Sequence, residues 1–335
     1  MASTLRNCTL VIALCSAAIF PGSGPVRADH ATVRNYRPFT TELYTKDKKL
    51  ARIALRRFIG KGKEYYLAVN PDTLESELAP VGKYLFLKRS LGEMREEHGN
   101  RAYFKALAFS ERNSRNLQNA GITHISGHGA AVYLTADLCP TRRPLDRALF
   151  MRIMNEYGNY HKPVPVALSI TGRWMEKHSA DLRWLIDLEK NKIISIVWIN
   201  HTYTHLYKKN LPLSKNFLLN KTAGIDEEIL HNEIAMIESG LIPSVFFRFP
   251  GLISNREAFL KITGLGLIPV GSDAWLGKNQ WPKQGSIILV HANNQELVGM
   301  KRLAGLINAK QKAIAAGEWM LRDIRAGIVE YMKMY

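Results

Sequence analysis

Long hydrophobic runs are scarce in this sequence, and the clearest one, at residues 10–20, is short for a membrane span. It follows Arg6 and precedes a segment rich in proline and glycine, with small residues just before a cleavage point after Ala28. This order is typical of a secretory signal peptide. We therefore expect residues 1–28 to be a signal peptide, the mature chain to have no transmembrane span, and the protein to be secreted or periplasmic.

Cysteine is scarce too, with only Cys8, Cys15 and Cys139 in 335 residues. The first two lie in the expected signal peptide, so one cysteine remains in the mature chain. A single cysteine excludes an internal disulfide bond even in an oxidising compartment. Stability must then come from the core, and a hydrophobic content of 46% is ordinary for a globular protein.

Acidic residues are few relative to basic ones, 29 against 46, which gives a net charge of +17. The two arginines of the expected signal peptide reduce this charge to +15. An exported protein this basic is attracted to anionic surfaces such as acidic envelope polymers. Nucleic acid is the competing partner, but the sequence has no signature of a nucleic-acid-binding module, and the export signal argues against it.

Residues 29–129 form an N-terminal region whose role the sequence does not indicate. Its segment 50–59 is compatible with either a basic amphipathic helix or a pair of strands. His124 and His128 are four residues apart, but they flank a glycine-rich turn, so we interpret them as loop residues rather than as a metal site.

From about residue 130 the pattern becomes regular. Short apolar runs alternate with helix-like stretches, which predicts parallel βαβ units and an α/β fold, either a barrel or an open doubly wound sheet. The runs are at 131–135, 164–171, 193–199, 244–249, 267–270 and 286–290, and the helix-like stretches include 181–189, 227–240 and 256–265. Residues 297–334 resemble a long helix that is broken near Gly317.

Two histidines, His201 and His205, follow the third apolar run. If the chain begins a helical turn there, both imidazoles can face one point. Neutral imidazole is a ligand for zinc, cobalt and nickel. The spacing alone is a weak signal, because two histidines four residues apart often occur by chance.

Other reactive side chains also follow the apolar runs. In a (β/α) barrel the carboxyl ends of the strands share one rim, where active sites are built. The residues at these ends are Asp137, His201, Arg248 with Pro250, Asp273 with Trp275, and His291.

Five short motifs occur in the order known from one family. Thr-Ala-Asp-Leu-Cys-Pro at 135–140 corresponds to its Thr-Phe-Asp-Asp-Gly-Pro, and His-Thr-Tyr-Thr-His at 201–205 meets its His-Ser/Thr-x-x-His fully. Arg-Phe-Pro-Gly-Leu at 248–252 corresponds to Arg-x-Pro-aromatic-Gly, Asp-Ala-Trp at 273–275 to its Asp-Trp pair, and Leu-Val-His at 289–291 to Leu-x-His. The chain thus resembles the polysaccharide deacetylase family (NodB homology, carbohydrate esterase family 4).

The resemblance implies a distorted (β/α) barrel over residues 130–335, preceded by an accessory region. It also implies a secreted, metal-dependent hydrolase that removes N-acetyl groups from a cell-envelope or extracellular polysaccharide. The expected cofactor is a divalent metal, zinc first, with cobalt or nickel as alternatives.

Metal and base are assigned by the same resemblance. His201 and His205 would bind the metal, and Asp137 would be the base, held ionised by Arg248. Asp137 could instead serve as a third metal ligand, because the family's second aspartate is replaced here by Leu138.

The remaining roles concern the leaving amine and the acetyl group. His291 would donate a proton to the amine, with Asp273 orienting it. Leu289 and Trp275 would wall a pocket for the acetyl methyl, and a backbone N–H near Gly251 would bind the oxyanion. Gly251 stands where the family has an aromatic residue, so we expect one wall of the groove to be open.

Two other functions stay open at this point. Loss of the carboxylate at position 138 is compatible with a non-catalytic glycan-binding protein on the same barrel. The same site could also cleave an ester, which would make the protein a polysaccharide O-acetyl esterase.

Overall fold

The computed structural model describes residues 32–127, 129–220 and 224–335, which all belong to one compact unit. The expected signal peptide and His128 lie outside the described residues. The division of the rest at residue 129 stays a prediction.

The chain first forms an antiparallel sheet in the order β4-β3-β2-β1-β5. Its strands are β1 (Val33–Tyr44), β2 (Leu50–Gly60), β3 (Lys63–Val69), β4 (Ser76–Pro80) and β5 (Leu85–Leu87). Segment 50–59 is therefore a strand, and the helical alternative was wrong. Strand β2 is paired on both sides, with β1 and β3, and this pairing supplies the backbone hydrogen bonds that its sequence alone did not predict.

Two short helices follow, α1 (Leu91–His98) and α2 (Ala102–Ser110), with the 3-10 turn η1 (Glu111–Asn113). Helix α1 begins at a capping box, in which the Ser90 hydroxyl accepts from the Glu93 N–H and the Glu93 carboxylate accepts from the Ser90 N–H.

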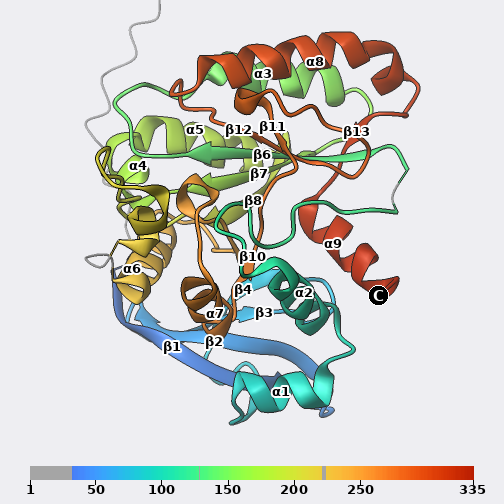
Figure 1. Ribbon diagram of the computed structural model, residues 1–335. Coiled ribbons are helices and arrows are strands. Elements are labelled where there is room, and N and C mark those ends of the chain that lie inside the picture. Colours follow the sequence, from blue (N-terminus) through green and yellow to red (C-terminus); the bar gives the residue numbers. More distant parts are fainter. Residues whose placement is uncertain (1–31, 128, 221–223) are drawn as a thin grey trace, which may run out of the picture. The chain divides into compact units, whose positions relative to one another are not determined.

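A second sheet is parallel throughout and has the order β10-β9-β8-β7-β6-β12-β11, with β13 paired to β6 (Figure 1). In the part of the chain that the structure describes, its end strands β10 and β11 are not paired with each other, so the sheet is a distorted, open (β/α) barrel. This is the predicted fold class. The strands are β6 (Ala131–Leu138), β7 (Val164–Ile170), β8 (Ile194–Asn200), β9 (Phe246–Phe247), β10 (Ile268–Pro269), β11 (Ala274–Trp275), β12 (Ile287–Val290) and β13 (Met320–Leu321).

Helices connect the parallel strands, as the alternating pattern predicted. They are α3 (Arg147–Tyr157), α4 (Gly172–Lys177), α5 (Ser179–Lys190), α6 (Ile225–Glu238), α7 (Arg256–Gly264), α8 (Leu297–Ala315) and α9 (Ile324–Lys333), with 3-10 turns η2 (Leu213–Lys215), η3 (Phe217–Leu219), η4 (Pro250–Leu252) and η5 (Leu276–Lys278). The predicted break near Gly317 is real, because Gly317 has a positive φ and β13 intervenes before α9. Among the described residues no helix has both the length and the apolar character that crossing a membrane requires.

Strand β6 shows how the fold positions polar groups. Its even-numbered residues, Val132 to Leu138, belong to the core cluster shared with α3, α5 and α8. Ala131 and Tyr133 face the opposite cluster, and Thr135 and Asp137 continue that face toward the carboxyl end. The sheet thus presents its polar residues on one face at one end.

Candidate active site

A buried ion pair lies at the carboxyl end of β6. The Arg248 guanidinium, fully buried, donates through Nη1 to Asp137 Oδ1 at 3.3 Å and to Thr135 Oγ1 at 2.9 Å. Its Nη2 donates to the carbonyl oxygen of Gly271 at 3.0 Å. Burial lowers the pKa of Arg248, and Asp137 partly offsets this effect. The predicted pairing of Arg248 with Asp137 is present in the structure.

His201 follows β8 on the same side as Asp137, and its Nε2 lies 3.6 Å from Asp137 Oδ2. Its Nδ1 lies 2.9 Å from the carbonyl oxygen of Arg248. A carbonyl can only accept, so the hydrogen-bond network assigns the proton of the neutral ring to Nδ1. Nε2 then keeps a free lone pair, which is the form of histidine that binds a metal.

His205 and Cys139 complete a three-membered group with His201. The Cys139 Sγ lies 3.6 Å from His201 Nε2 and 3.5 Å from His205 Nε2, and all three donor atoms lie within 4.8 Å of one another. Burial would raise the pKa of the Cys139 thiol, but His205 and His201 hold it well below its ordinary value. The two predicted histidines therefore converge, and a cysteine that the motif comparison passed over converges with them.

His291 follows β12 and meets a carboxylate that the sequence did not suggest. Its Nδ1 lies 3.2 Å from Glu296 Oε2, which also accepts from Trp275 Nε1 at 3.0 Å. Burial lowers the pKa of His291, but Cys139 and Glu296 more than offset this and raise it well above its ordinary value. Glu296 is therefore placed to orient His291.

Asp273, the residue expected to orient His291, is engaged elsewhere. Its carboxylate accepts from the Ile287 N–H at 3.0 Å and the Ser286 hydroxyl at 3.1 Å, and lies 2.8 Å from His124 Nδ1. The expected role of Asp273 is corrected accordingly, because its oxygens tie β12 to the segment before β11. His124 is in turn a hydrogen-bonded structural residue, as expected for a loop.

A cavity of about 440 Å³ opens over these groups. Cys139, His205 and His291 line this cavity, but His201 does not. Two aromatic side chains, Tyr207 and Phe217, are also in the lining, together with Pro140, Thr204, Gly251 and Gln295. Leu289 and Trp275, expected to wall the acetyl pocket, are not in this lining. Leu289 lies inside β12 with 1% exposure.

Gly251 does not leave the groove open as expected. Its φ is +61°, and a Cβ at this position would lie 2.7 Å from the ring of Phe217. Phe217 therefore supplies an aromatic surface at the place where the motif has lost one. The oxyanion was expected to bind a backbone N–H near Gly251. The Leu252 N–H, next to Gly251, instead donates to the carbonyl oxygen of Phe249 at 2.9 Å within the turn.

Further residues that the sequence reasoning missed hold the loops in place. Asn293 Nδ2 donates to Cys139 O at 2.8 Å, and Gln295 Nε2 donates to Pro140 O at 2.7 Å. Glu228 of α6 accepts from the Thr204 N–H at 2.8 Å. The one signal available for Cys139 was its place directly after Leu138, at the end of a strand.

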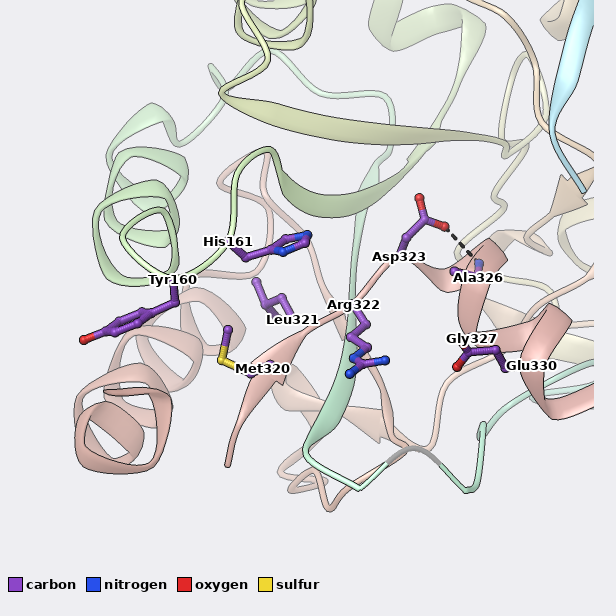
Figure 2. A pocket seen from close by; sticks show the side chains of 9 residues that line it. All are labelled: Tyr160, His161, Met320, Leu321, Arg322, Asp323, Ala326, Gly327 and Glu330. Atoms are coloured by element: carbon purple, nitrogen blue, oxygen red, sulfur yellow. Dashed lines mark hydrogen bonds between the residues drawn. The ribbon is translucent and has the colours of Figure 1, made fainter. Parts of the chain in front are cut away.

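A second cavity, of about 300 Å³, is lined by other residues (Figure 2). It is lined by β13 and the start of α9, where Asp323 accepts from the Ala326 N–H. Because β13 pairs with the first residues of β6, Ala131 and Val132, this cavity is at the amino end of the strand. It takes no part in the site at the carboxyl end.

One family model and several solved structures are similar to this chain. Residues 34–105 match the family model described as "RP012 protein N-terminal domain". The solved structures include a family 4 carbohydrate esterase from Bacillus anthracis, with 16% identity and a TM-score of 0.46, over 64% of this chain and 88% of that one. PdaA of Bacillus subtilis is 14% identical over 65% of this chain and 94% of its own, with a TM-score of 0.46. A pseudoenzyme from Bacillus anthracis is 16% identical over 63% of this chain and 70% of its own, with a TM-score of 0.43.

These structures all belong to carbohydrate esterase family 4. This is the family whose motifs the chain resembles.

Proposed function

We propose that this protein is a metal-dependent hydrolase that removes N-acetyl groups from a polysaccharide of the cell envelope or extracellular matrix. The observation that supports it is the convergence of the possible metal ligands Cys139, His201 and His205 beside the buried Asp137–Arg248 pair, next to a cavity that Cys139, His205 and His291 line. Amide hydrolysis needs these parts: a metal or oxyanion site, a base for water and an acid for the amine.

Asp137 is the base in this proposal. Arg248 and Thr135 form a rigid, buried support, since Arg248 donates to Asp137 and to Thr135 with the same Nη1. The guanidinium fixes the position of the Asp137 carboxylate, which in this proposal takes a proton from water.

His291 is the acid. Its Nδ1 faces Glu296, which sets the orientation of the ring, and the ring lines the cavity in which the leaving amine would lie. Phe217 and Tyr207 provide ring faces beside the cavity, against which a sugar ring can lie.

The donor set of His201, His205 and Cys139 fits zinc or cobalt, because imidazole nitrogen and sulfur suit these ions. Bound there, the metal would polarise the acetyl carbonyl and lower the pKa of a water molecule.

Acetate release from N-acetylglucosamine oligomers tests this function. We expect release by protein supplied with zinc, loss of release on chelation, and a fall of about 10²–10⁴-fold in Asp137→Asn, the range that general base catalysis contributes. Acetyl-xylan in parallel would show whether an ester is preferred. Folded, zinc-loaded protein that releases acetate from none of these polymers would refute the enzymatic function.

A second candidate is a glycan-binding protein without catalysis, supported by the fully buried Leu138 at the position of the lost carboxylate. It predicts retention on a glycan column without metal, unchanged in Asp137→Asn. Export through residues 1–28 and attraction of the basic surface to anionic envelope polymers remain parts of the proposal.

A further inference from the structure

We infer that the Cys139 thiolate is the third protein ligand of the metal site, which makes the site a Cys-His-His centre that takes zinc or cobalt. The inference rests on the metal centre of the proposed function, and it concerns the identity of the donor.

Strand geometry puts Cys139 on the correct side of the sheet. Side chains alternate along β6, so Thr135 and Asp137 face Arg248 while Leu138 points into the opposite core. Cys139 is the next residue on the face of Asp137. A leucine buried in the core cannot bind a metal, but the residue after it reaches the site without any bulge.

The distances match those of a metal-bound pair. A tetrahedral zinc ion with Zn–S of about 2.3 Å and Zn–N of about 2.0–2.1 Å holds its sulfur and nitrogen ligands about 3.6 Å apart. The observed separations from Cys139 Sγ are 3.6 Å to His201 Nε2 and 3.5 Å to His205 Nε2. Both histidines are thus at the spacing expected for a shared ion.

The surroundings favour a ligand role over a nucleophile role for Cys139. A nucleophilic cysteine needs one base, whereas here two imidazole nitrogens lie at nearly equal distances from one sulfur. The thiol is buried, with 4% exposure, and Asn293 holds its backbone carbonyl at 2.8 Å. Three protein ligands would leave one position of a tetrahedral ion open, as in catalytic zinc sites, and two of the three, Cys139 and His205, line the cavity.

The donor exchange has a chemical consequence. A thiolate carries the same single negative charge as a carboxylate, so the charge of the centre is preserved. Sulfur is the softer donor, and it therefore disfavours magnesium and manganese, which prefer oxygen ligands.

Cobalt substitution tests the inference without reference to activity. Metal-stripped protein is titrated with Co²⁺, and the near-ultraviolet absorption is recorded, because a thiolate ligand produces a sulfur-to-cobalt charge-transfer band. We expect the band at one equivalent in the unmodified sequence and in Cys8→Ser/Cys15→Ser, and its absence in Cys139→Asp, which puts a carboxylate in the place of the thiolate.

A chelator competition supplies the affinity. Cys139→Ala should weaken zinc binding by roughly 100-fold or more, since even groups that only orient ligands are worth about 10–100-fold. Cys139→Ser, the smallest change of shape, and circular dichroism check that loss of the band is not loss of the fold. Iodoacetamide should modify Cys139 in chelator but not in zinc.

Binding of Co²⁺ without the charge-transfer band, survival of the band in Cys139→Asp, or equal alkylation with and without zinc would overturn the inference. Failure of the proposed function is distinguishable from these outcomes. If the protein shows the band but releases no acetate, the Cys-His-His centre is supported and the deacetylase function is refuted. If the protein releases acetate but shows no band, the deacetylase function is supported and the Cys-His-His centre is refuted.

Discussion

At the scale of single residues, the site depends on which carboxylate each histidine meets. His291 and Glu296 are five residues apart in the chain, and Glu296 Oε2 holds both the His291 ring and the Trp275 indole. Burial would raise the pKa of Glu296, but hydrogen bonds from His291 and Trp275 lower it overall, so its charged form is favoured. Glu296 is therefore a positioning residue for the proposed acid.

Glu296→Gln should lower kcat for acetate release by roughly 10- to 100-fold, a part of the about 10²–10⁴-fold that general acid catalysis contributes. KM should change less, because Glu296 does not line the cavity. Steady-state kinetics on an N-acetylglucosamine oligomer measures both constants.

Asp273→Asn is the matched comparison for this variant. Asp273 bonds to His124, Ser286 and Ile287, so its loss should lower the melting temperature more than kcat. A large fall of kcat in Asp273→Asn together with a normal kcat in Glu296→Gln would contradict the assignment.

At the scale of elements, helix α6 fixes the loop that carries both histidines. Glu228 accepts from the Thr204 N–H, and its own carbonyl oxygen accepts from the Tyr203 N–H at 3.0 Å. Asn232, one turn further along α6, donates to Asn200 Oδ1 at 2.8 Å. Two residues of this loop, Thr202 and His205, have positive φ, which L-residues adopt only where surrounding contacts hold them.

Glu228→Ala should therefore weaken zinc binding although Glu228 contacts no metal ligand. We expect a loss of roughly 10–100-fold, the usual effect of removing a group that orients metal ligands. Chelator competition measures the affinity, and faster amide exchange at residues 202–205 would show the loosened loop.

The control is Glu227→Ala on the same helix, because Glu227 is exposed whereas Glu228 is buried. It should bind zinc as the parent protein does. Equal effects of the two substitutions would show that the helix as a whole, and not the Glu228 carboxylate, sets the loop.

At the scale of the whole described unit, one buried ion pair joins the antiparallel sheet to the barrel. Arg56 of β2 donates through Nε to Glu233 Oε2 of α6 at 2.8 Å and through Nη2 to Oε1 at 3.0 Å, and the Tyr36 hydroxyl donates to the same carboxylate. Both charged side chains are almost fully buried. Such a pair adds little stability compared with apolar residues of similar size, but removal of one partner is strongly destabilising because it leaves a buried charge unpaired.

Arg56→Met should lower the free energy of unfolding by about 3–5 kcal/mol, because it leaves the Glu233 carboxylate buried without its partner. The double variant Arg56→Met/Glu233→Met should lose less free energy of unfolding than the sum of the losses of the two single variants, because no unpaired charge remains buried. Urea unfolding followed by circular dichroism measures these values.

A surface pair in the same sheet is the control for this experiment. Arg57 and Glu64 pair near the solvent, and Arg57→Met should leave the stability almost unchanged. If Arg56→Met were as mild as Arg57→Met, the buried pair would not be what joins the sheet to the helix.

The parallel part of the fold could be predicted because its signals are local. Each buried strand is a continuous apolar run, and each helix a periodic one, so β6 to β8 and α5 to α7 appear close to the expected bounds. Strand β2 could not be decided in this way, since its alternation is irregular and its pairing partners, β1 and β3, determine its conformation.

The candidate site could be predicted in part for a similar reason. Asp137 is the penultimate residue of β6, and His201, Arg248 and His291 directly follow β8, β9 and β12; parallel strands bring such residues to one edge. Cys139 and Glu296 were missed because their roles depend on distance and direction, which neither residue type nor spacing reports.

The sequence by itself determined the alternation of strands and helices, the residues at the strand ends and the positive charge, because these follow from the order of apolar and polar side chains. Only the tertiary structure decided which side chains meet. The alternation of β6 places Leu138 in the core and Cys139 beside His201, α6 places Glu228 under the loop, and the turn after β12 places Glu296 rather than Asp273 against His291. These are contacts across the chain, and they exist only once the sheet has formed.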